Sequence, residues 1–188
     1  MRWTLLAAAL LLAACDATAD PSPPPTPAPS GASAVPELRL PAVAAGATCP
    51  VTAPTRWHSP SAAYAVLGPG PVYPVADYFQ PGPVLELRAA DRNHDGSYTK
   101  KVRWIAEGYG GPVLVRAARI DGPGAAAVEF SYRGEERSGG WHAELTAPAS
   151  DIPATTTVSG PGCYAYQVDG TGFRATVVFR AAYSGFAG

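Results

Sequence analysis

The amino-acid sequence predicts an all-β domain, a two-sheet immunoglobulin-like sandwich, and three observations support this prediction. The chain holds 20 glycines and 21 prolines among 188 residues, which interrupt it too often for long helices. After position 20 no stretch has apolar residues at sustained helical spacing. Instead, roughly seven short apolar or alternating stretches are separated by turn-forming segments, as is typical of a sandwich with Greek-key connections. A single sheet closed on itself is the second choice.

The clearest strand is expected at 173–180, where Phe173, Ala175, Val177 and Phe179 point one way. Such alternation is typical of a half-buried antiparallel strand. Residues 162–168 should pair with it, because the sequence DGTG at 169–172 supplies a hairpin turn. Further strands are expected at 84–89, 101–106, 112–117, 128–132, 141–145 and 155–159. Residues 49–83 lack clean alternation, so we expect an extended first strand and an irregular cap there.

The first fifteen residues, MRWTLLAAALLLAAC, combine a basic Arg2, an apolar run and a cysteine at its end. The run from 5 to 14 is too short to cross a hydrocarbon core, which takes roughly 20 helical residues. This stretch resembles a bacterial lipoprotein signal, which implies removal of residues 1–14 and acylation of Cys15. The mature protein would then be lipid-anchored to the bacterial cell membrane, outside the cytoplasm. An ordinary secretory signal cleaved near Ala14 or Ala19 is the alternative.

Residues 15–33 are expected to form a linker between this anchor and the folded domain. Positions 16–33 read DATADPSPPPTPAPSGAS, which holds almost nothing to bury. A proline-rich segment of this kind favours an extended spacer of about 3.1 Å per residue. The remainder, 34–188, is the length of one domain, and we expect it to be the β-sandwich.

Cysteine usage indicates an oxidising compartment. If Cys15 carries lipid, Cys49 and Cys163 are left as a pair, and their bridge would tie the start of the domain to its penultimate strand. Two buried free thiols are the alternative. The sequence holds no Cys-x-x-Cys, so neither a redox dithiol nor a zinc knuckle is expected.

Three segments, 95–106, 111–124 and 160–181, look like a group of uncharacterised secreted bacterial lipoproteins with a small β-sandwich. The segment GCYAYQVDG, which begins at Gly162, is the most specific part of the resemblance. The resemblance implies fold and exposure but no activity. Cys163 begins its strand, whereas the immunoglobulin core cysteine lies in mid-strand, so the usual core disulfide packed on a tryptophan is not expected.

Two patterns deserve mention as ligand sites. Asp91, Asn93 and Asp95 match the first half of a calcium loop, in which oxygen ligands recur at every second residue. Position twelve would be Val102 and the flanks read as strands, so a tight turn is the preferred interpretation and calcium the weaker one. Possible ligand-contact aromatics are found in the irregular region, namely Trp57, Tyr73, Tyr78 and Phe79.

Other chemistry is not indicated. The three histidines, His58, His94 and His142, belong to no catalytic motif, and no cofactor motif is found. With 14 basic and 15 acidic residues the chain has no basic field for nucleic acid. The sequence therefore predicts a noncatalytic module that binds an envelope protein, a glycan or a peptide. An extracytoplasmic hydrolase with an unrecognised site and a structural spacer without a ligand are the alternatives.

Overall fold

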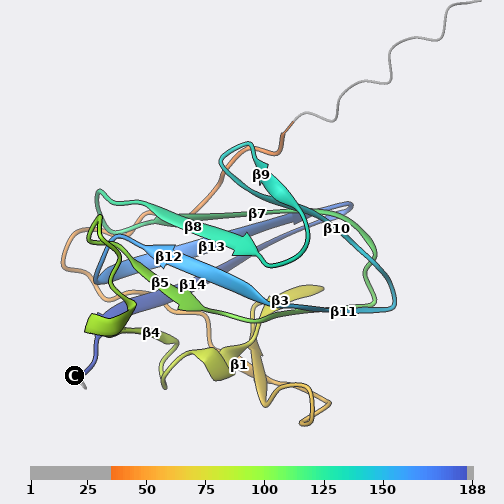
Figure 1. Ribbon diagram of the computed structural model, residues 1–188, viewed down its shortest axis with the longest axis horizontal. Helices are drawn as coiled ribbons and strands as arrows, with labels where there is room; N and C mark the ends of the chain where they lie inside the picture. The colour runs from red at the N-terminus through yellow and green to blue at the C-terminus, as the bar shows by residue number, and fades with distance from the viewer. Residues whose placement is uncertain (1–34, 186–188) are drawn as a thin grey trace, which may run out of the picture. The chain divides into compact units, whose positions relative to one another are not determined.

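The computed structural model describes residues 35–185, which form two layers of β-strands (Figure 1). The expected signal peptide, Cys15 and the linker lie outside these residues. The first layer is a six-stranded sheet with the order β4-β14-β13-β7-β10-β9. Its strands are β4 (Val84–Leu87), β14 (Phe173–Tyr183), β13 (Gly162–Gly170), β7 (Gly111–Arg119), β10 (Gly140–Leu145) and β9 (Glu135–Arg137). Neighbours are antiparallel except β4 and β14, which run parallel.

The second layer consists of two three-stranded sheets that continue one another, β5-β12-β8 and β11-β6-β3. Its strands are β5 (Tyr98–Lys101), β6 (Trp104–Glu107), β8 (Ala126–Phe130), β11 (Ala149–Ile152), β12 (Ala154–Val158) and β3 (Val72–Pro74). Two residues separate β5 from β6 and one separates β11 from β12. The Val102 N–H donates to the Ala154 carbonyl at 3.0 Å and so joins the two sheets across these breaks.

A small pair of strands, β1 (Pro54–Arg56) and β2 (Ala65–Leu67), completes the architecture. The helical content of the described part is two 3-10 turns, η1 (Ala76–Tyr78) and η2 (Ala89–Asp91). Within residues 35–185, no helix has the length and apolar character needed to span a membrane. The all-β sandwich predicted from the sequence is confirmed.

Large aromatic side chains fill the space between the layers. Tyr166 lies at the centre, with its ring 4.6 Å from Phe179 and 5.1 Å from Trp104. Phe130 contacts Trp104 from the second layer at 5.8 Å, and Tyr164 stacks on Phe179 at 5.7 Å. All five side chains are buried. The alternation predicted at 173–180 is thus confirmed, because Phe179 and its apolar neighbours face this core.

Two strand predictions need correction. The strand expected at 128–132 ends at Phe130, because Tyr132 has a φ of 66° and an exposed fraction of 98%. The extended first strand expected within 49–83 is replaced by three strands of three residues each. The sequence analysis also missed β11, whose exposed and buried residues alternate over only four positions.

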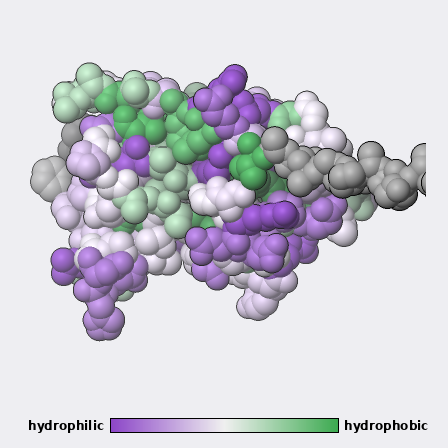
Figure 2. Space-filling model, turned by 90° about the horizontal axis from the view of Figure 1, so that it is seen from above, coloured by the Kyte–Doolittle hydropathy of each residue, from purple (hydrophilic) through white to green (hydrophobic). Residues whose placement is uncertain are grey.

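The outer face of the six-stranded sheet is covered by the segment 35–52, which we call the strap. Leu40 and Val43 pack on a cluster that contains Ile120, Ala165 and Val178. The Val43 N–H donates to the Ile120 carbonyl at 2.8 Å, and the Thr52 N–H donates to the Val178 carbonyl at 2.9 Å. The strap therefore buries the face of the sheet that alternation assigns to solvent. Figure 2 shows one face of the molecule, on which apolar residues form a band bordered by hydrophilic ones.

A buried polar network lies beneath the amino end of the strap. The fully buried Gln167 accepts the Arg39 N–H at 2.6 Å and donates to the Glu37 carbonyl at 2.9 Å. Gln167 also donates to Asp169, which forms ion pairs with Arg116 of β7 and with Arg174 of β14, each at 2.7 Å. Burial would raise the pKa of Asp169, but these hydrogen bonds outweigh it and keep that pKa below its ordinary value.

Candidate functional site

The four aromatic residues predicted to contact a ligand do not form an exposed patch. Trp57 is buried and lies edge-on to the half-buried Tyr73, at 5.2 Å between ring centroids. Phe79 is buried in the main core, 5.6 Å from Phe179. Tyr78 is half-buried and packs against both hydrophobic clusters. Burial therefore assigns Trp57 and Phe79 to the core rather than to a surface that a ligand can reach.

The Asp91–Gly96 segment is a hydrogen-bonded turn. Asp91 forms an ion pair with Lys100 and accepts the Arg88 N–H at 3.2 Å. Asn93 donates to Ser97 at 2.8 Å, and Asp95 accepts the Ser97 N–H at 2.9 Å. Protein donors thus hold one carboxylate oxygen of Asp91 and one of Asp95. Within residues 35–185, no three His, Cys, Asp or Glu side chains are grouped so as to hold a metal ion.

The three histidines lie in separate segments of the chain. His58 meets Glu107 at 3.1 Å between Nε2 and Oε1, and at least half of each side chain is exposed. His94 is exposed and His142 is half-buried in β10. Ser59 and Ser61 hydrogen-bond to one another at 3.3 Å beside His58.

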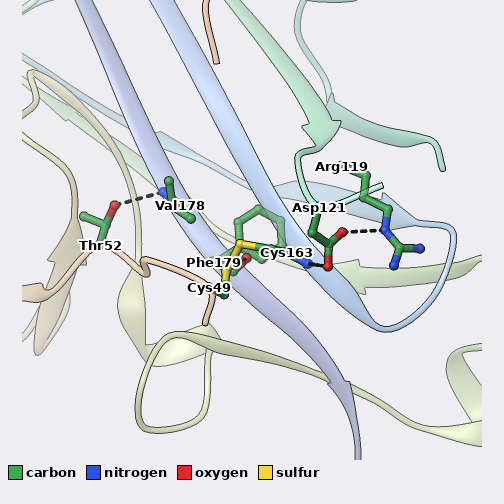
Figure 3. The surroundings of a disulfide bond; sticks show 7 residues. All are labelled: Cys49, Thr52, Arg119, Asp121, Cys163, Val178 and Phe179. Carbon is green, nitrogen blue, oxygen red and sulfur yellow. Dashed lines mark hydrogen bonds and ion pairs between the residues drawn. A yellow bond between two sulfur atoms is a disulfide. The ribbon is translucent and has the colours of Figure 1, made fainter. Parts of the chain in front are cut away.

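The predicted disulfide between Cys49 and Cys163 is present (Figure 3). The two Cα atoms are 5.5 Å apart, and the bridge joins the strap to the start of β13. Cys163 is buried on the outer face of the six-stranded sheet, among the residues that the strap covers. The Thr52–Val178 hydrogen bonds lie close by, so the strap is held at two neighbouring points.

A groove with a volume of about 810 Å³ opens beside this bridge, and we call it the disulfide groove. Five segments contribute to its wall: 47–51 of the strap, 81–84 at the start of β4, 119–121 at the end of β7, 161–163 at the start of β13 and 180–183 of β14. The volume lies within the roughly 300–1,000 Å³ of common ligand sites. The disulfide joins two of these segments covalently and therefore holds this part of the groove wall together.

One side of the groove is an ion pair that is fixed in place. Arg119 donates to Asp121 at 2.7 Å, and the second oxygen of Asp121 accepts the Cys163 N–H at 2.9 Å (Figure 3). Burial would raise the pKa of Asp121, but these hydrogen bonds hold it below its ordinary value, so the carboxylate is charged at neutral pH. Gly162 leaves the space that Arg119 fills, because a Cβ at this position would lie 2.8 Å from Nε.

The other side of the groove carries Arg180 and Tyr183 on β14. Arg180 is half-buried, and no carboxylate among residues 35–185 pairs with it within 4.0 Å. Tyr183 is 45% exposed, and its hydrogen bond with Tyr98 raises its pKa above the ordinary value. The groove can thus offer a guanidinium to a ligand.

The sequence analysis did not single out these groove residues. Its one signal was the strand alternation, which places Arg180 on the outward phase of β14. The groove needs the strap as a wall, and the strap has no alternation of its own from which its position can be predicted.

Comparison of the chain with protein-family models, with curated proteins and with solved structures found no match in any of the three. The likeness of three carboxyl-terminal segments to secreted lipoproteins therefore stays a prediction from the residues.

Proposed function

We propose that this protein is a lipid-anchored, noncatalytic binding module that works outside the cytoplasm and holds its ligand in the disulfide groove. The observation that carries the proposal is the Cys49–Cys163 bridge in the wall of the groove. Structural disulfides persist in oxidising compartments outside the cytoplasm. The bridge also accounts for two of the three cysteines and leaves Cys15 for acylation.

The linker supports the same proposal. An extended proline-rich spacer between Cys15 and the strap reaches about 3.1 Å per residue. The domain would then lie within several nanometres of the membrane surface, where an envelope protein, a glycan or a peptide is within reach. Several acyl chains on one cysteine make such an anchor effectively permanent, because each buried CH₂ contributes about 0.8 kcal/mol.

Metabolic labelling with palmitate tests the anchor. The wild-type chain should incorporate label and fractionate with membranes, whereas Cys15→Ser should incorporate none and be released. Cys49→Ser is the matched control, because it removes a cysteine that the proposal does not acylate. Equal labelling of wild type and Cys15→Ser would contradict lipid anchoring.

Cross-linking in the native envelope tests the binding module. A photoreactive residue at position 82 lies in the groove wall, and one at position 132 lies on an exposed turn. The proposal expects a discrete adduct from position 82 that position 132 does not give. Identical background from both positions would favour a spacer without a ligand, and cleavage of the captured partner would favour a hydrolase.

A further inference from the structure

We propose that the ligand of the disulfide groove is a peptide segment that presents a carboxylate beside small apolar side chains, with Arg180 as its anchor. This inference rests on the proposed function and adds the class of ligand. It depends on the charge of the groove, on the side chains that line it and on the rigidity of its wall.

The charge of the groove favours an anion. Its charged lining consists of Arg119, Asp121 and Arg180. Arg119 and Asp121 neutralise one another, and Asp121 is further occupied by the Cys163 N–H. Arg180 is left with its positive charge and no carboxylate within 4.0 Å among residues 35–185. A guanidinium presents its donors in a planar fork that matches a carboxylate in two parallel hydrogen bonds.

The remaining lining favours a peptide over a sugar. Apart from the charged residues, the groove is lined mostly by Ala, Val, Pro, Gly and the disulfide. Thr48 and Tyr183 are its remaining polar side chains. Each hydroxyl of a bound sugar that lost water without gaining a partner would cost free energy, and Arg119 and Asp121 are already hydrogen-bonded to one another. Small apolar side chains of a peptide need no such partners.

The position of Arg180 within the sheet supports a preformed site. Its backbone N–H donates to the Pro83 carbonyl at 3.0 Å, and it lies opposite Cys163 in the register of β13 and β14. The disulfide fixes the strap on the neighbouring strand β13. A ligand would meet an arginine whose backbone is already fixed in the sheet, and this lowers the entropic cost of binding.

Nuclear magnetic resonance of the full chain with its disulfide intact tests the proposal. The probes are acetyl-Ala-Glu-Ala-amide, its neutral counterpart acetyl-Ala-Gln-Ala-amide, glucuronate and acetate, each titrated to roughly 10 mM, the range in which weak ligands bind. The glutamate peptide should shift the amides of Arg180, Cys163 and Gly82. The glutamine peptide should bind about ten- to a hundredfold more weakly, because a hydrogen-bonded charge is lost.

Two variants locate the effect. Arg180→Gln should reduce affinity for the glutamate peptide by the same ten- to hundredfold, and Arg137→Gln on the opposite edge strand β9 should leave it unchanged. The amide spectra of both variants report whether the fold is retained. Equal binding by wild type and Arg180→Gln would overturn the proposal, as would absence of shifts with the glutamate peptide.

Tighter binding of glucuronate than of the peptide would also overturn it, in favour of an acidic glycan. Acetate binding as tightly as the peptide would show a site for a small free ion and would refute the peptide class. These failures are separate from failure of the binding module itself. If cross-linking from position 82 still captures a partner in the Arg180→Gln protein, the module stands and the ligand class is wrong.

Discussion

Reduction of the Cys49–Cys163 bridge should lengthen the part of the chain that mechanical load can extend by about 400 Å. The two cysteines are 114 residues apart in sequence, and their Cα atoms are 5.5 Å apart in the fold. A fully extended chain spans about 3.3–3.6 Å per residue, so freeing this loop adds about 370–410 Å. While the bridge is intact, the loop between Cys49 and Cys163 cannot be extended, because load applied at the chain ends passes across the disulfide and not through the loop.

Optical tweezers with handles on the two ends of the full chain measure this length directly. The complete unfolding extension should differ by the stated amount between traces recorded with and without dithiothreitol. The Cys49→Ala/Cys163→Ala variant is the control, and its extension should be long in both conditions. A wild-type extension that does not depend on reductant would refute the assigned pairing and, with it, the covalent wall of the disulfide groove.

Three further predictions concern the strap, the polar network and the core. Gln167→Ala should speed hydrogen exchange of the Arg39 N–H and lower the free energy of unfolding by about 1–3 kcal/mol, because two buried hydrogen bonds to the strap are lost. Asp169→Asn should cost about 3–5 kcal/mol at neutral pH, because it leaves Arg116 buried without its counter-ion. Since folding lowers the pKa of Asp169, its contribution is present above an unfolded value of about 3.9 and is lost as pH falls through the folded value, so acid should destabilise the wild type more steeply than the variant. Phe179→Ala should cost about 3–5 kcal/mol in urea unfolding, because its ring fills the centre of the core.

Matched controls separate these effects from general perturbation. Gln80→Ala removes an exposed glutamine and should leave strap exchange unchanged. Asp151→Asn removes a carboxylate that is 62% exposed, so its cost should stay within about 1 kcal/mol. Tyr132→Ala removes an aromatic residue that is 98% exposed and should change stability by less than about 0.5 kcal/mol. Equal effects in a test variant and its control would contradict the corresponding explanation.

Strand alternation predicted the hairpin of β13 and β14 because local sequence determines both its turn and its inward face. The same rule failed for the outer face. Gln167 and Asp169 occupy positions that alternation assigns to water, yet both are buried. Their burial comes from a segment more than 100 residues earlier in the chain, which binds Gln167 through backbone atoms. Contacts to backbone leave no side-chain pattern that a sequence can display.

The disulfide was predictable and the groove beside it was not. Cys49 and Cys163 could be paired by counting cysteines, whereas the side chains of the groove come from five separate segments. Arg119 and Asp121 are two residues apart, but only the fold places them beside Cys163. The burial of Trp57 and Phe79 was not predictable, because composition cannot tell a surface aromatic from one that fills a core.

The parallel pairing of β4 with β14 has a consequence for biosynthesis. A ribosome makes Val84 well before Arg180, the residue opposite it in the register. At about 5–20 residues per second this delay is roughly 5–20 s. During that time β4 has no neighbour in the six-stranded sheet, and β7 also waits for β13. The six-stranded sheet can therefore be completed only after β13 and β14 have emerged.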